Sequence, residues 1–150
     1  MVKSPRIFHA LQQANTSLFR AADNELRARE GITTSHQVIL FVLAEEDGLP
    51  SSEIAKRSAM SKSRLTGLVD TLVAKRLVLR AQGQTDARQQ LLHITDDGRA
   101  LIARTRQWVT SLNKALLDPF DAAERETILR FLQQAQALAA TISKSESQAG

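Results

Sequence analysis

Apolar residues recur at steps of three and four along most of the chain, which is the spacing of one face of an α-helix. The first such pattern covers residues 7–26, and Gly31 is expected to end the helix. Thr33 offers a cap for a second helix, which ends where the Asp-Gly pair at 47–48 turns the chain. The N-terminal third is therefore predicted to be helical.

Two more helices, one short and one longer, are predicted on either side of the turn Ser58-Ala59-Met60. The short helix begins near Ser51, and Ser61 is the expected cap of the longer one. The face of the longer helix opposite its apolar stripe is small and polar, so this face can approach another surface closely. The stripe follows the helical spacing throughout: Leu65, Leu68, Val69, Leu72 and Val73.

After Arg76 the spacing of apolar residues changes from helical to extended. The apolar runs 77–79 and 91–94 are separated by a polar loop that contains Gly83, and this pattern predicts a β-hairpin. A short helix, a turn, a longer helix and a hairpin, in that order, are typical of a winged helix-turn-helix. We assign this motif to residues 33–98, with the wing at 77–94, and predict a mainly α fold with a small β-hairpin.

Two further helical patterns follow the hairpin. Thr95 is the expected cap of the first, which Pro119 ends, and Asp121 with Glu124 resembles a capping box at the start of the second. Residues 1–150 are treated as a single domain. In addition to 33–98, it contains helices within 5–30 and 99–143 and a flexible tail at 144–150.

The long helices at the two ends of the chain carry more apolar surface than a small three-helix core can cover. This surplus is expected to pack against a second copy of the chain, which would make residues 5–30 and 99–143 dimerisation helices. The alternative is a monomer whose long helices fold back on their own core.

Positive charge is concentrated in the middle of the chain. Residues 51–90 hold eight Lys or Arg against three Asp or Glu, whereas the rest of the chain holds twelve against thirteen. Because affinity for DNA depends on neutralising phosphates, a basic segment that coincides with a helix-turn-helix indicates a DNA-binding surface. The alternative is an ordinary solvated basic face.

The longer helix breaks local rules on the face that would meet DNA. Lys62 and Arg64 place positive charge in its first turn, where this charge opposes the helix dipole. Gly67 costs about 1 kcal/mol relative to Ala in a helix interior. Such violations are expected at functional sites, so we interpret these residues as DNA contacts, with Ser63 and Thr66 reaching base edges or phosphates. Ordinary surface charge and an unconstrained exposed glycine are the alternatives.

The loop of the hairpin ends with Asp86 and Arg88. An Asp at this spacing can accept hydrogen bonds from the guanidinium of Arg88 and orient it, and an arginine on a β-ribbon suits a narrow minor groove. The alternative is a surface ion pair of little energetic weight.

Several short matches along the same segment resemble the MarR family of bacterial transcriptional regulators, and the resemblance covers essentially the whole chain. They are Leu68-Val69-Asp70-x-Leu72, Leu77-Val78-x-Arg80, Asp86-x-Arg88 and Ile94-Thr95-x-x-Gly98. The resemblance implies a homodimeric winged-helix repressor that binds a pseudo-palindromic operator in double-stranded DNA. It also implies release by a small effector, often an aromatic or phenolic acid. The recognition helix, residues 61–76, would enter the major groove, and the wing would lie at the minor groove.

By position, the resemblance puts the DNA contacts on nine residues of the recognition helix and wing, which we call the nine contact residues: Ser61, Lys62, Ser63, Arg64, Thr66, Gly67, Arg80, Asp86 and Arg88. Three positions depart from the family pattern. Arg76 stands where a Gly usually ends the recognition helix, Ala87 replaces a frequent Arg, and Gly67 stands where a basic residue is common. These departures bear on the operator sequence and not on the class of protein.

The chain has no Cys, which excludes disulfides, thiol sensing and Cys-ligated metals. His9, His36 and His93 show no paired ligand spacing, so we predict neither a metal nor a cofactor. His9 or Arg20 could meet the carboxylate of an effector. Four aromatic residues could line an effector pocket or simply belong to the core: Phe8, Phe19, Phe41 and Trp108.

No nucleophile with a base, no phosphate loop and no metal cluster is recognisable in the sequence, so an enzyme finds little support. Neither a signal peptide nor an apolar stretch long enough for a bilayer is recognisable, and we therefore expect a cytoplasmic protein with no membrane partner. The alternative to a DNA-binding regulator is a winged-helix protein–protein adaptor whose polar helix face meets an acidic protein.

Overall fold

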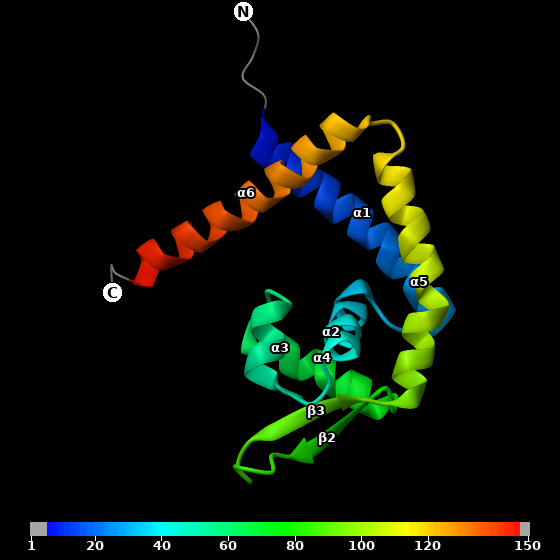
Figure 1. The fold of residues 1–150 in the computed structure, drawn as a ribbon, viewed down its shortest axis with the longest axis vertical. Coiled ribbons are helices and arrows are strands. Elements are labelled where there is room, and N and C mark those ends of the chain that lie inside the picture. The colour runs from blue at the N-terminus through cyan, green and yellow to red at the C-terminus, as the bar shows by residue number, and fades with distance from the viewer. Residues whose placement is uncertain (1–5, 148–150) are drawn as a thin grey trace, which may run out of the picture. The chain divides into compact units, whose positions relative to one another are not determined.

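The structure, a computed structural model, describes residues 6–147 and confirms a mainly helical fold with a small antiparallel sheet (Figure 1). The chain forms two compact units, one up to Thr105 and one from Arg106 onward. The elements in chain order are α1 (Ile7–Glu30), α2 (Thr34–Glu45), β1 (Leu49–Pro50), α3 (Ser51–Arg57), α4 (Lys62–Ala74), β2 (Val78–Gln82), β3 (Gln90–Ile94), α5 (Asp96–Leu117) and α6 (Ala122–Ser147).

The helix ends lie where the capping residues predict them. Gly31 adopts a left-handed φ of 67° and its N–H donates to the Arg27 carbonyl at 3.1 Å, which ends α1. At the start of α2 the Thr33 N–H donates to His36 Nδ1 at 3.1 Å. His36 therefore takes the place that Glu or Gln has in an ordinary capping box.

The two long helices at the C-terminal end also begin at their predicted caps. Thr95 Oγ1 accepts a hydrogen bond from the Gly98 N–H at 3.0 Å at the start of α5. Asp121 and Glu124 form a reciprocal capping box, with backbone to carboxylate distances of 2.8 and 2.9 Å. α6 continues to Ser147, beyond the expected start of a tail at residue 144, and residues 148–150 of that predicted tail lie outside the described residues.

The recognition helix α4 ends in a Schellman motif that uses Arg76 in place of glycine. The Arg76 N–H donates to the Val73 carbonyl at 3.0 Å, and the Leu77 N–H donates to the Leu72 carbonyl at 2.9 Å. This geometry requires a left-handed backbone, and Arg76 has a φ of 59°. The departure from the family pattern at this position is therefore accommodated by a strained arginine.

Replacing Arg76 with Gly is expected to raise the free energy of unfolding by about 0.5–1 kcal/mol. A left-handed conformation costs an L-residue roughly 1–2 kcal/mol, and the greater backbone entropy of glycine in the unfolded chain offsets part of that gain. Urea unfolding followed by circular dichroism measures the change. Arg76→Ala is the matched control, since it removes the same charge but keeps the Cβ atom. Equal stability of the two variants would contradict this prediction, because the strain at position 76 would then be no larger than the entropic cost of glycine.

A three-stranded antiparallel sheet in the order β1-β3-β2 contains the predicted hairpin. In the pairing of β2 with β3, Val78 is opposite Ile94, and both are buried because they point to the same face. The sequence pattern did not predict β1, which pairs Leu49 with Leu92. A strand of two residues, one of them Pro50, is too short to show an alternation of apolar and polar positions.

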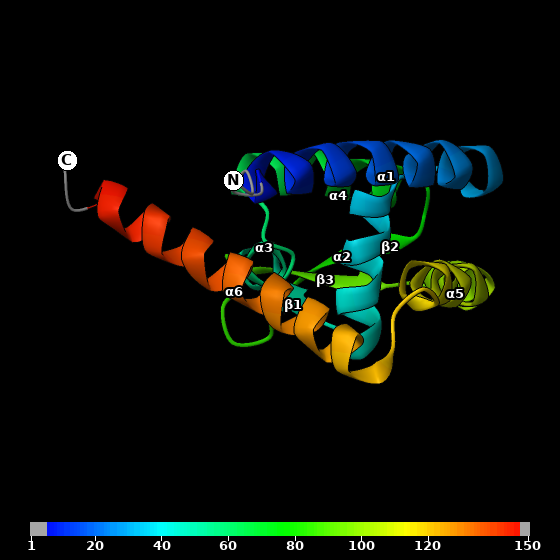
Figure 2. The same cartoon turned by 90° about the horizontal axis from the view of Figure 1, so that it is seen from above.

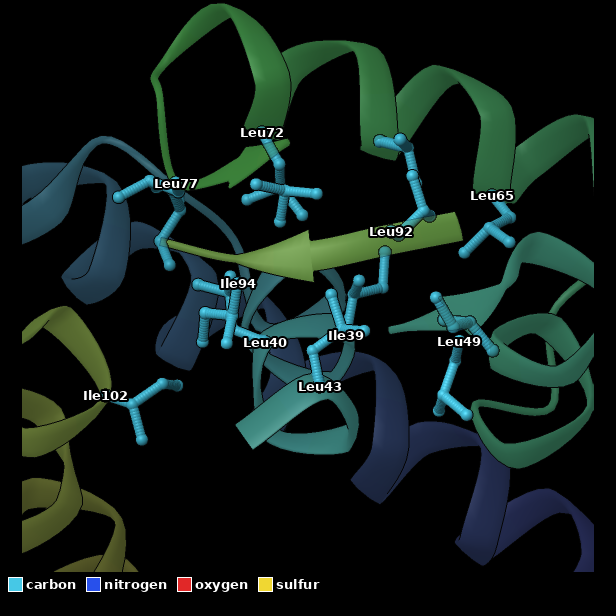
Figure 3. Close-up of a cluster of buried hydrophobic side chains, with 14 of the residues drawn as sticks. Ile39, Leu40, Leu43, Leu49, Leu65, Leu72, Leu77, Leu92, Ile94 and Ile102 are labelled. Atoms are coloured by element: carbon cyan, nitrogen blue, oxygen red, sulfur yellow. The ribbon is translucent and has the colours of Figure 1, made fainter. Parts of the chain in front are cut away.

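The core of the N-terminal unit lies between α2, α4 and the sheet, as Figure 3 shows. Leu65 and Leu72 point from α4 toward β3, and Leu92 and Ile94 extend from that strand (Figure 3). Fully buried members of this cluster include Ile39, Leu40, Leu43, Ile54, Leu72 and Val78. The core thereby holds α4 by one face only and leaves its polar face outward.

α1 is a single continuous helix, and its C-terminal end leads into the loop before α2 (Figure 2). Of its predicted apolar stripe only Leu26 is buried, and Phe8 is 85% exposed.

Among the described residues, no helix combines the length and apolar character that a bilayer crossing demands.

Candidate nucleic-acid interface

The recognition helix begins at a serine cap. Ser61 has an extended backbone, and its Oγ accepts a hydrogen bond from the Arg64 N–H at 3.3 Å. Leu65, Val69 and Leu72 are buried, which fixes the rotation of the helix about its own axis. The outward face carries Ser63, Gly67, Asp70 and Ala74, all of which are exposed.

Gly67 has open space on all sides. A Cβ atom built at this position would meet nothing within 4 Å, so packing within the chain gives no reason for a glycine. The side chain of Thr66 beside it donates from Oγ1 to the Lys62 carbonyl at 2.9 Å. The donor of Thr66 is therefore used within the helix, while the lone pairs of its oxygen remain available as acceptors.

All nine contact residues are exposed, and they lie on α4 or in the β2–β3 hairpin and its loop. Their placement on these two elements of the N-terminal unit follows the sequence prediction. Within this set, three cations have no carboxylate partner among the described residues: Lys62, Arg64 and Arg88.

Arg64 contacts a residue far away in the sequence. Its Nη2 donates to Ser35 Oγ in the first turn of α2 at 2.7 Å. A hydroxyl leaves the charge of the guanidinium intact, whereas a carboxylate would neutralise it. Arg64 therefore remains a cation at the junction of α2 and α4, where a phosphate could bind.

The hairpin loop differs from the expectation in how Asp86 acts. Its carboxylate accepts from the backbone N–H of Arg88 at 2.9 Å, and no ion pair of the Arg88 guanidinium occurs in the described part of the chain. A carboxylate two residues before an N–H forms an Asx turn, so Asp86 shapes the loop and does not hold the guanidinium. The Gly83 N–H closes the loop by donating to the Gln89 carbonyl at 2.7 Å.

Arg80 lies at the base of the hairpin and forms an ion pair with Asp70 of α4. Sequence reasoning assigned Arg80 to DNA but did not foresee a partner for it. The two residues are ten positions apart on different elements, so no periodicity could have paired them.

Two further residues hold the hairpin against the helices, and sequence reasoning assigned neither this role. Asp47 accepts from the Ile94 N–H at 2.8 Å and lies 3.2 Å from His93 Nδ1. Thr95 Oγ1 donates to the Arg76 carbonyl at 2.8 Å, at the end of α4. The Asp-Gly pair at 47–48 signalled only a turn, and Thr95 only a helix cap.

The described residues contain no group of three or more potential metal ligands. His36 is nearly buried, and this burial, followed by the nearby charge of Lys75, lowers the pKa of its imidazole. A surface hollow on α1 brings His9 and Arg20 to one wall, but its lining includes none of the four candidate aromatic residues. The predicted effector pocket thus stays a prediction.

The fold is a winged helix, and comparison with known proteins indicates a DNA-binding transcriptional regulator. Residues 30–89 match the MarR family. It is 29% identical over 127 residues to a putative transcriptional regulatory protein for the hcr operon of Thauera aromatica, covering 85% of this chain and 76% of the relative. Members of the family and these relatives are transcriptional regulators and not enzymes.

Two other comparisons concern a curated relative and a solved structure. The homoprotocatechuate degradative operon repressor of Escherichia coli is 24% identical, covering 73% of this chain and 74% of the relative. The solved structure of Sco3205 from Streptomyces coelicolor, a MarR family regulator in complex with DNA, superposes with a TM-score of 0.80. That match has 23% identity and covers 89% of this chain and 91% of the other, so it supports the fold.

Proposed function

We propose that the protein is a homodimeric repressor that binds a pseudo-palindromic operator in double-stranded DNA. The observation that carries this proposal is the exposure of all nine contact residues on α4 and the hairpin, while the opposite side of α4 is fixed in the core. A helix held in this way presents its outward face to the major groove, and the hairpin loop then reaches the minor groove beside it. We infer a cytoplasmic location, because a regulator must reach the DNA.

The charge of the surface supports a phosphate-binding role. Five cations of residues 51–90 form neither an ion pair nor a hydrogen bond to a hydroxyl among the described residues: Lys56, Lys62, Lys75, Arg76 and Arg88. Arg64 adds a sixth charge that a hydroxyl holds without neutralising it. Six exposed positive charges on one segment are enough for a salt-dependent affinity for DNA.

The dimer is supported by unburied apolar side chains on the terminal helices. On α1, Phe8 and Leu18 are exposed, and none of the described side chains of α6 is buried, including Leu129 and Leu138. Large exposed apolar patches mark interaction surfaces. Light scattering after size-exclusion chromatography should give twice the chain mass of 16.5 kDa, and a single chain mass would contradict the dimer.

The proposed effector is a small molecule, with an aromatic acid as the first candidate. The Escherichia coli relative is named for the repression of a homoprotocatechuate degradative operon, which supports this chemistry.

Selection of tight-binding duplexes from a random library tests the DNA-binding proposal directly. The expected result is enrichment of one sequence with two inverted half-sites about one helical turn apart. A winged-helix adaptor would enrich no sequence, and binding of an acidic protein without any DNA preference would favour that alternative.

A further inference from the structure

Asp70 is an acidic residue in the middle of a surface that should attract phosphates. It lies on the outward face of α4, one turn after Gly67, and its side chain is 61% exposed. An unpaired carboxylate there would repel the DNA backbone, since the potential near DNA is negative. Its presence therefore needs a reason.

The ion pair with Arg80 supplies that reason. Arg80 belongs to β2, and its guanidinium reaches across to the Asp70 carboxylate of α4. Among the nine contact residues that the structure describes, Arg80 is the one whose charge a carboxylate neutralises. The pair connects the recognition helix to the first strand of the wing and takes one cation away from the phosphates.

We propose that Asp70 is a positioning residue that makes DNA binding more selective by holding Arg80. This inference rests on the proposed DNA-binding function. Binding to DNA of any sequence depends almost entirely on charge, whereas binding to an operator also depends on contacts to base edges. On the operator, base contacts fix the position of the protein, whereas on random DNA a freed Arg80 can bind whichever phosphate lies nearest. A carboxylate that withholds Arg80 therefore weakens binding to random DNA more than binding to the operator.

Direct base recognition by Asp70 is the competing role. A carboxylate in the major groove can accept a hydrogen bond from the exocyclic amine of cytosine. In that case Asp70 would specify one base pair, and its replacement would change the preferred sequence at that position.

The test uses the Asp70→Asn variant, which preserves the shape of the side chain and removes its charge. Fluorescence anisotropy is measured over a series of KCl concentrations, with the duplex that the wild-type protein selects and with a mixed-sequence duplex of equal length. We expect affinity for the mixed-sequence duplex to rise about threefold to tenfold, with a salt slope steeper by about 0.9, the value for one more neutralised phosphate. The preference for the selected duplex should fall.

Glu53→Gln is the matched control. It adds the same net charge, but Arg57 remains paired with Glu46 at 2.7 Å, so no arginine is freed. Its salt slope should stay near that of the wild type. The double variant Asp70→Asn/Arg80→Gln should also return to the wild-type slope, because the freed cation is then absent.

Three outcomes would overturn this proposal, and a fourth would refute the proposed function. An Asp70→Asn slope equal to that of Glu53→Gln overturns the proposal, and so does a changed base preference at one position with an unchanged slope, which would indicate cytosine recognition. A rise confined to the selected duplex also contradicts it. Failure of the wild-type protein to bind any duplex would refute the proposed function itself. The wild-type protein is therefore tested first, before the variants are compared. Thermal unfolding by circular dichroism confirms that each variant is folded.

Discussion

Replacing Gly98 with Ala is expected to lower the free energy of unfolding by about 2–3 kcal/mol. Gly98 is buried in the first turn of α5, where that helix meets the end of α4 and the start of the wing. A Cβ atom there would overlap the Leu77 carbonyl oxygen and approach Ile94 Cγ1 to 2.7 Å. The carbonyl cannot move away cheaply, because it already accepts the Thr95 N–H at 3.0 Å.

The same substitution at Gly67 is the matched control and should have the opposite sign. Position 67 is exposed in a helix interior with open space around it, so alanine should stabilise the protein by about 1 kcal/mol through helix propensity. Urea unfolding of both variants measures the difference. Similar stabilities for the two alanine variants would contradict the packing that the structure shows around Gly98.

These two glycines show what the sequence could and could not predict about the fold. Residue spacing and capping residues predicted the long helices, the recognition helix and the hairpin, because those signals are local in sequence. The resemblance to a family motif included Gly98 but offered no physical reason for it. That reason is a contact with Leu77, which lies twenty-one positions earlier in the connection between α4 and β2.

The prediction of the contact surface was limited in the same way, because signals along the sequence do not show which elements pack together. The family resemblance placed the nine contact residues on the recognition helix and the wing, and all nine side chains are exposed. The partner of Arg64 is Ser35 of α2, and the partner of Arg80 is Asp70 of α4. Such pairs depend on how elements pack, and no periodicity along one chain encodes them.

Replacing Lys62 or Arg88 with Ala is expected to weaken binding to the selected duplex by more than 1 kcal/mol each, or about tenfold. Lys62 begins the recognition helix and Arg88 ends the wing loop, so the two residues represent the two proposed points of contact with DNA. Neither side chain has an ion-pair partner in the described part of the chain, so little stability should be lost with the charge. Fluorescence anisotropy across a salt series measures affinity and slope together.

The two variants should differ in sequence dependence. A residue that contacts only phosphate should lose affinity equally for selected and mixed-sequence duplexes, with a salt slope shallower by about 0.9. Replacing a residue that contacts base edges should reduce affinity more for the selected duplex than for the mixed-sequence duplex. Lys114→Ala is the control, since it removes one exposed positive charge of α5 that is already paired with Asp118, just after that helix, at 2.6 Å. If Lys62→Ala and Arg88→Ala both bound as the Lys114→Ala control does, the assignment of the DNA-contacting surface to α4 and the wing would be wrong.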